Sequence, residues 1–272
     1  MRHDRPMPAP AALTERRLPL PSGNGMPLLG FGTWQLNRAA ATRATSWALA
    51  AGYRHLDTAT MYRNEREVGA AVRDSGVRRE DVFLTTKLPP DRSGAEQATL
   101  SRSLELLGTQ YVDLWLIHWP PRRGVGLDAW KVLVEARAHG QAWDIGVSNY
   151  SLAQLDELSA ATGVTPAVNQ IEWSPLLFDR AELDWHRERG VVLEGYSALK
   201  GGALEHPAIL GIAERLRRTP AQVIVRWHLQ HDVVVIPKSS AQGRIVANAD
   251  VDGFELSAQD MIALDALGRS AQ

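Results

Sequence analysis

The chain has 272 residues, of which 44% are hydrophobic and 22% charged, and its formal net charge is −1 at pH 7. This composition is typical of a globular protein, and the near-zero charge gives no sign of a nucleic-acid or membrane partner. The absence of cysteine excludes disulfides and thiol catalysis and favours a reducing compartment, so we expect a cytoplasmic protein.

The chain begins with a segment that lacks the apolar core of a secretory signal. We expect residues 1–16 to form a disordered tail and residues 17–272 to form a single domain. Between two short apolar runs lies Pro21-Ser22-Gly23-Asn24-Gly25. Asn-Gly favours a two-residue hairpin turn because both positions tolerate positive φ. We predict a β-hairpin here that caps one end of the domain.

Short apolar runs then alternate with amphipathic stretches to the end of the chain. Eight runs are typical of buried strands: residues 29–34, 53–57, 82–87, 112–118, 143–148, 166–172, 191–196 and 233–236. Helices are expected over residues 39–51, 93–107, 127–139, 151–161, 179–189, 207–217, 220–230, 242–249 and 258–267. A further helix is expected to begin at residue 64. Eight strand–helix units predict an α/β protein with a closed (β/α)₈ barrel and a short C-terminal helix. A doubly wound sheet is the alternative, but the Gly-rich phosphate turn after its first strand is absent.

The run from Gly52 to Gly69 concentrates several local signals. A strand ends at Asp57, Tyr62 lies on the loop beyond it, and Asn64 stands where a helix begins. We expect the Asn64 oxygen to cap the helix, with Glu67 in its positive first turn.

Four polar residues fall at or just beyond the carboxyl ends of three consecutive predicted strands: Asp57, Tyr62, Lys87 and His118. Barrels of this kind carry their functional groups at that rim. A Lys ammonium about 4 Å from a phenol stabilises the phenolate by roughly 4 kcal/mol at an effective dielectric near 20, before desolvation opposes it. Together these groups can donate a proton to a carbonyl. Taken singly, Lys87 could be a solvated strand end and His118 a hydrogen-bonded core group.

This pattern resembles the aldo-keto reductase family. The run from Gly52 to Gly69 is similar to the family signature, and Asp57, Tyr62, Lys87 in Thr-Thr-Lys-Leu and His118 in Leu-Ile-His-Trp-Pro match its catalytic tetrad. The resemblance covers most of the chain beyond the tail and fits compact bacterial and plant-type members, similar to 2,5-diketogluconate or methylglyoxal reductases. It implies NADPH-dependent reduction of small carbonyls, α-dicarbonyls or keto sugars, with Tyr62 as the proton donor.

The same resemblance implies a site for NADPH or NADP⁺. Matching Ser, Asn and Gln residues hold the nicotinamide carboxamide, and Tyr196 matches the aromatic residue that stacks on the ring. Lys238 and Arg244 favour a ribose 2′-phosphate, and hence NADPH over NADH. The expected cofactor-binding residues are Thr33, Asp57, Ser148, Asn149, Gln170, Tyr196, Ser197, Leu199, Lys238, Ser239, Arg244 and Asn248.

The substrate is expected to be a small-molecule carbonyl bound in a rather open pocket. The loop from Trp119 to Gly126 is short, and Trp34, Met61 and Trp119 are the expected apolar walls. We expect a monomer without a metal ion.

Three positions depart from the family pattern. Strand alternation places Asp144 on the same side as Ser148, facing into the barrel, where a carboxylate needs polar partners. We hypothesise that Asp144 pairs with a polar group of the barrel, and His55 is one candidate. Ala198 replaces a usual Pro, which predicts a more mobile loop over the pyrophosphate, and Ala247 stands where an acidic residue often contacts the adenine.

Two other functional classes remain open. A cofactor-binding regulatory subunit on the same fold, as in potassium-channel β subunits, would keep a similar site without significant turnover. A metal-dependent barrel hydrolase would use His118 and nearby carboxylates, but the sequence has no His-x-His pair or carboxylate cluster at the strand ends to support it.

Overall fold

A computed structural model describes residues 14–270 of the chain. Most of the predicted tail, residues 1–13, lies outside the described residues. The remaining tail residues contact the domain: the Thr14 hydroxyl donates to the Asp252 carboxylate, and Arg16 forms an ion pair with Asp232 at 2.9 Å.

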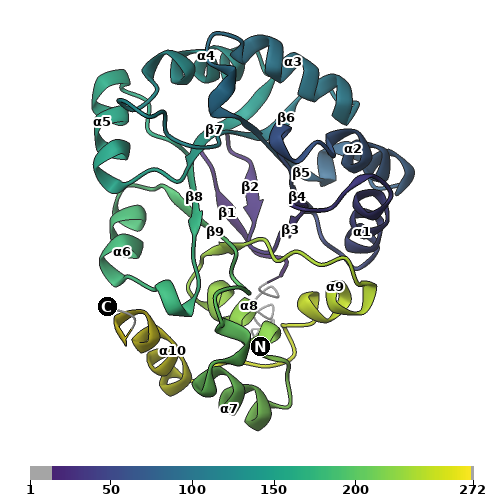
Figure 1. Ribbon diagram of the computed structural model, residues 1–272, viewed down its shortest axis with the longest axis vertical. Helices are drawn as coiled ribbons and strands as arrows, with labels where there is room; N and C mark the ends of the chain where they lie inside the picture. Colours follow the sequence, from purple (N-terminus) through teal and green to yellow (C-terminus); the bar gives the residue numbers. More distant parts are fainter. Residues whose placement is uncertain (1–13, 271–272) are drawn as a thin grey trace, which may run out of the picture.

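Eight parallel strands form one sheet in sequence order, from β3 to β10 (Figure 1). The sheet curves until its first and last strands meet. The Gly30 amide donates to the Val235 carbonyl, and the Val235 amide donates to the Leu28 carbonyl, both at 2.9 Å. The predicted (β/α)₈ barrel is therefore confirmed. Its strands are β3 (Phe31–Gly32), β4 (His55–Asp57), β5 (Phe83–Leu88), β6 (Val112–Ile117), β7 (Ala142–Ser148), β8 (Val168–Glu172), β9 (Val192–Tyr196) and β10 (Val234–Val235).

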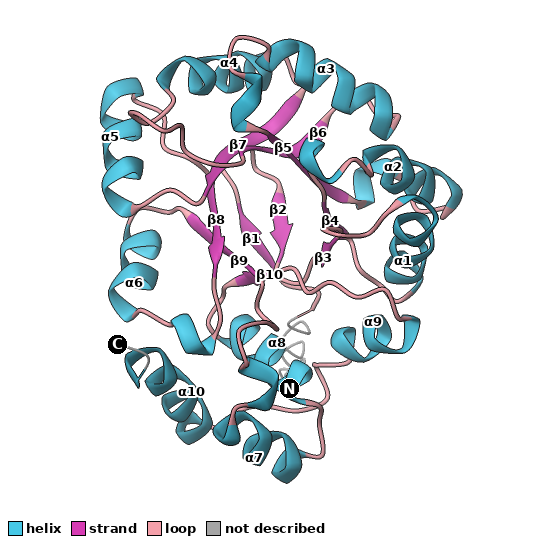
Figure 2. Ribbon diagram, viewed as in Figure 1, coloured by secondary structure: helices cyan, strands magenta, loops and turns pink. Residues whose placement is uncertain are grey.

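Helices surround the strands, with α7 and α10 beside each other outside the ring (Figure 2). Ser151 and Thr219 begin α5 and α8 with capping boxes that satisfy the free amides of the first turn. None of the helices within residues 14–270 is long and apolar enough to cross a membrane. The helices are α1 (Arg38–Ala50), α2 (Glu65–Asp74), α3 (Glu96–Leu107), α4 (Leu127–Ala138), α5 (Leu152–Thr162), α6 (Arg180–Glu188), α7 (Pro207–Leu216), α8 (Pro220–Gln230), α9 (Gln242–Ala249) and α10 (Ala258–Ser270).

The first barrel strand is shorter than predicted. Only Phe31 and Gly32 pair with β4, although residues 29–34 all have strand character. At Gly30, the neighbouring strand passes very close, and an added Cβ would lie 2.5 Å from the His55 ring nitrogen Nδ1. The side chains of His55 and Ile236 pack so tightly against the closing seam of the barrel that only glycine fits at this position.

The predicted N-terminal hairpin is present, but its turn differs. Strand β1 (Arg17–Pro19) pairs antiparallel with β2 (Gly25–Pro27), so Gly25 belongs to the strand. The prediction of a two-residue Asn-Gly turn is wrong. Residues 20–24 form a longer loop, and Gly23, with φ of +89°, supplies the left-handed residue.

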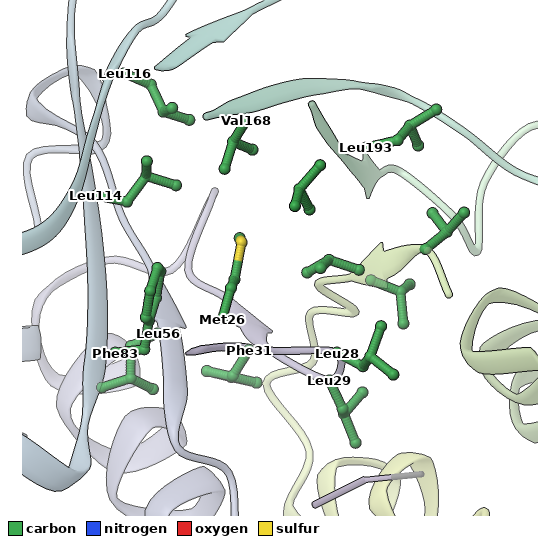
Figure 3. Packing of buried hydrophobic residues seen from close by; sticks show 14 of the residues in the cluster. Met26, Leu28, Leu29, Phe31, Leu56, Phe83, Leu114, Leu116, Val168 and Leu193 are labelled. Carbon is green, nitrogen blue, oxygen red and sulfur yellow. The ribbon is translucent and has the colours of Figure 1, made fainter. Parts of the chain in front are cut away.

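The hairpin closes one end of the barrel with an apolar side chain. Met26 is fully buried. Figure 3 shows it among Leu56, Leu114 and Val168, which come from three different barrel strands. The role predicted for the hairpin as a cap is therefore confirmed by its packing.

Asp144 anchors this hairpin to the barrel. Its carboxylate accepts the Ser22 amide at 3.1 Å and also the Ser22 hydroxyl. Burial raises the pKa of Asp144, and the two bonds from Ser22 oppose that rise. A polar partner is present, as expected, but it comes from the hairpin loop, and the candidate His55 is wrong, because its Nε2 lies 3.5 Å from Glu194. The actual partner of Asp144 is Ser22, and the position of its loop could not be predicted from the sequence.

We expect Ser22→Ala to lower the free energy of unfolding by about 1–2 kcal/mol, because Asp144 loses one of its donors in a buried setting. Urea denaturation measures the change. Ser101→Ala, which removes an exposed hydroxyl on α3, is the matched control and should stay within about 0.5 kcal/mol of the unsubstituted protein. Equal stability of both variants would contradict the anchoring role.

Candidate active site

A cavity of about 710 Å³ opens at the carboxyl ends of the barrel strands. Sixteen of the side chains predicted for the site line it, whereas Thr33 and Lys87 do not. Thr33 instead donates its hydroxyl to the Asp57 carbonyl at 2.9 Å. The lining residues among those predicted are Trp34, Asp57, Met61, Tyr62, His118, Trp119, Ser148, Asn149, Gln170, Tyr196, Ser197, Leu199, Lys238, Ser239, Arg244 and Asn248.

Lys87 lies fully buried behind the cavity wall at the end of β5. Its Nζ is 2.6 and 2.7 Å from the two carboxylate oxygens of Asp57 and 3.0 Å from the Thr58 carbonyl. On its other side it donates to the Tyr62 hydroxyl at 3.4 Å. Gln170 holds the second Asp57 oxygen at 2.8 Å. The ammonium is therefore fixed between a carboxylate and the phenol, as predicted from the sequence.

The pKa values of Lys87 and Tyr62 are set by burial and by the charges around them. Burial lowers the pKa of Lys87, but Asp57 and Tyr62 together outweigh burial, so the pKa of the ammonium is raised. For Tyr62, burial raises the pKa and outweighs the lowering by Lys87. The phenol is consequently a neutral acid that faces a permanent cation.

His118 lies beside Tyr62 at the end of β6. The two rings meet edge to face, with centroids 5.6 Å apart. Burial and the nearby Lys87 charge lower the pKa of His118 to about 3. The imidazole is therefore neutral near pH 7 and retains one N–H that can donate a hydrogen bond.

Asn64 fixes the loop that carries Tyr62. Its side-chain oxygen accepts the Thr58 hydroxyl at 2.8 Å, and its amide donates to the carbonyls of Thr33 and Leu36, both at 2.9 Å. Asn64 does precede α2, as predicted, but the expected capping bond to the helix is not formed. The side chain joins two loops instead, the one after β3 and the one after β4, and this holds the phenol over Lys87.

Polar groups from β7, β8 and β9 meet on the opposite wall. Asn149 and Ser197, which directly follow β7 and β9, have left-handed backbones with φ of 65° and 55°. This conformation is uncommon for non-glycine residues and clusters at functional sites. The Tyr196 hydroxyl donates to Asn149 Oδ1 at 2.7 Å, and the Asn149 amide donates to Ser148 Oγ at 3.0 Å.

A cluster of cations lies at the far side of the cavity, after β10. Burial lowers the pKa of Lys238, and the neighbouring charges of Lys200 and Arg244 lower it further. Arg244 also donates to the Ser239 hydroxyl at 3.2 Å. This donor set suits a phosphate group, while the amides and hydroxyls of the opposite wall suit a carboxamide. The two walls together match the chemistry of a nicotinamide dinucleotide. In residues 14–270, no group of three or more His, Asp or Glu side chains could hold a metal ion.

Lys200 and Glu194 are two of the residues of this region that were not predicted. Lys200 places its Nζ 3.9 Å from the centre of the Trp34 ring, and this contact joins two loops with no sequence signal for their meeting. Glu194 is fully buried in β9 beneath the Lys87–Asp57 pair. The sequence signal that could have identified Glu194 is its charge within the otherwise apolar run from Val191 to Tyr196.

Comparisons with known proteins identify the family of the chain. The model of the aldo/keto reductase family matches residues 25–269. An aldo-keto reductase from Mycolicibacterium smegmatis is 46% identical over 255 residues, covering 92% of this chain and 93% of the relative. A glyoxal reductase from Bacillus subtilis is 41% identical over 254 residues, covering 92% of each chain. The crystal structure of an aldo/keto reductase from Brucella melitensis matches with a TM-score of 0.88 and 42% identity, covering 92% of this chain and 98% of that one. The chain belongs to the aldo/keto reductase family.

Proposed function

We propose that the protein reduces small aldehydes, ketones, α-dicarbonyls or keto sugars to alcohols with NADPH, and that Tyr62 donates the proton. Membership of the family makes the protein an oxidoreductase that acts on carbonyl groups. The observation that carries the finer proposal is the position of Lys87 Nζ between the Asp57 carboxylate and the Tyr62 hydroxyl.

A bound nicotinamide would supply the hydride that adds to the carbonyl carbon. Tyr62 gives its proton to the carbonyl oxygen and becomes a phenolate. Lys87 stabilises that phenolate by an amount on the order of 4 kcal/mol at an effective dielectric near 20. Asp57 keeps the ammonium in place, and the neutral His118 directs its N–H at the substrate oxygen.

The polar walls of the cavity support a dinucleotide cofactor. Ser148, Asn149 and Gln170 hold the carboxamide edge, and Tyr196 lies where it can stack on the ring. Lys238 and Arg244 bind the 2′-phosphate, which distinguishes NADPH from NADH.

The proposed substrate class follows from the mouth of the cavity. Trp34, Met61 and Trp119 line it and are 44%, 52% and 46% exposed. Large apolar side chains that remain this exposed form an open, weakly polar rim. Such a rim suits small carbonyl compounds, and the Bacillus subtilis relative is named a glyoxal reductase.

We expect Tyr62→Phe to abolish reduction while NADPH still binds, because the substitution removes only the acidic hydroxyl. Loss of NADPH absorbance with a panel of aldehydes, α-dicarbonyls and keto sugars measures turnover, and quenching of tryptophan fluorescence measures binding. Tyr111→Phe, at the opposite end of β6, is the control. Normal turnover by Tyr62→Phe would refute the assignment. Binding without turnover by the unsubstituted protein on the whole panel would favour the regulatory-subunit alternative.

We expect Asp57→Asn to lower the free energy of unfolding by about 3–5 kcal/mol, because it leaves the Lys87 charge buried without its partner. Adding Lys87→Met to this variant should recover part of the loss, since no unpaired charge remains. Denaturation in urea gives the values for Asp57→Asn, for Lys87→Met alone and for the double variant, and the exposed Lys131→Met is the control. Simple addition of the two single losses would show that the ion pair contributes no coupling.

We expect Arg244→Ala to raise the Kd for NADPH by about ten- to a hundredfold, because a charge-assisted bond to the phosphate is lost. The Kd for NADH should change little, since NADH lacks this phosphate. Titration calorimetry with both cofactors measures the effect, and Arg43→Ala on the exposed side of α1 is the control. Equal weakening for NADPH and NADH would exclude a 2′-phosphate contact.

A further inference from the structure

Glu194 is a buried acid for which the proposed reaction has no use. It lies in the middle of β9, paired in register with Gln170 of β8 and Val234 of β10, and it is fully buried. Within residues 14–270, neither of its carboxyl oxygens forms a hydrogen bond of normal geometry, although the Gln170 side chain lies close enough to favour the anion. Its nearest charged or titratable contact is His55 Nε2, at 3.5 Å. A carboxyl group left in this state is costly as an anion.

Titratable and charged groups surround Glu194 from the other barrel strands. His55 and Asp57 face it from β4, and Lys87 faces it from β5. The Asp57 and Lys87 charges cancel each other in their ion pair. Burial lowers the pKa of His55 to about 3, so this imidazole is neutral and supplies no positive charge. An ionised Glu194 would therefore give the buried group a net negative charge with no cation to match it.

The direction of its ionisation follows from these contacts. Burial raises the pKa of Glu194 to about 8, with Asp57 adding to the rise, while Gln170 and Lys87 oppose it. At neutral pH the group is mainly a carboxylic acid. Once ionised, it raises the pKa of Tyr62, which already lies above its ordinary value because of burial.

We propose that Glu194 is a positioning residue that holds a proton beneath the Asp57–Lys87 pair, so that no second buried carboxylate competes with the Tyr62 phenolate for Lys87. This inference deepens the proposed function and rests on it. When Glu194 loses its proton, its anion competes for Lys87 and repels the phenolate. Proton donation by Tyr62 then becomes less favourable, although Glu194 touches neither the substrate nor the phenol.

The rate of reduction should therefore fall as the pH rises through the ionisation of Glu194. For one ionisation near pH 8 and an inactive anion, the fall between pH 6.5 and pH 9 is about tenfold. In Glu194→Gln, the neutral amide cannot ionise, so the ratio of the rate at pH 9 to that at pH 6.5 should rise several-fold above the ratio of the unsubstituted protein. NADPH oxidation at saturating glyoxal, followed from pH 6 to pH 10, gives these ratios. Glu182→Gln, a partly buried acid on α6, is the matched control.

A second readout needs no turnover. The ordinary pKa of a Glu side chain is 4.5, and folding raises that of Glu194 to about 8. Its contribution to stability is therefore fully present below pH 4.5 and is lost as the pH rises toward 8. Urea denaturation between pH 5 and pH 9 should show this loss in the unsubstituted protein and a flatter profile in Glu194→Gln. Glu194→Met repeats both measurements with a second neutral side chain in case the glutamine variant does not fold.

Parallel decline of the rate in the unsubstituted protein and in the neutral variants would overturn the inference, as would parallel stability profiles. A rate that stays high at alkaline pH in the neutral variants, together with a flatter stability profile, would support it. Absence of NADPH oxidation by the unsubstituted protein at every pH would refute the proposed reaction instead, and the stability profiles would still decide whether Glu194 holds the proton.

Discussion

The buried ion pair between Lys87 and Asp57 is the contact on which the site depends. An ammonium in this position would be too costly to bury alone, and the carboxylate would be equally costly. Each charge stabilises the other in the interior, and the pair fixes the position of the ammonium that contacts the Tyr62 hydroxyl. The barrel supplies the required geometry, because β4 and β5 are neighbours that end at the same rim. The same ion pair therefore contributes both to the stability of the barrel and to the chemistry of the site.

The neighbouring groups of the barrel interior are neutral, and this leaves the pair undisturbed. His55 and His118 both have a pKa of about 3, the first lowered mainly by burial and the second by burial and by Lys87. Glu194 reaches the same neutral state at physiological pH by the opposite route, through a raised pKa. The Lys87 ammonium, held by Asp57, is therefore the cation that the phenol meets, although five titratable groups lie within the same small volume. This arrangement explains how Tyr62 can remain protonated before the reaction and still donate its proton to the substrate.

Sequence patterns predicted the features that depend on element order. The eight-strand alternation predicted the barrel, and the strand ends predicted that Asp57, Lys87 and His118 would converge. Contacts made by loops were not predictable in the same way. Asn64 has the local sequence of a helix cap, yet it binds the loop after β3, which only the folded chain brings to it. The strand pattern placed Asp144 in the interior correctly but gave no means of finding its partner, which lies in the hairpin loop.

The contact between Asp144 and Ser22 joins two positions that are 122 residues apart in the chain. Each of the two side chains would lose a hydrogen-bond partner without the other. An apolar residue at 144 would leave the hairpin loop without its acceptor, whereas a loop without donors would leave a carboxylate in the barrel floor unsolvated. Related chains should therefore exchange these two residues jointly rather than one at a time, so that the pair co-varies although no catalytic demand acts on either position.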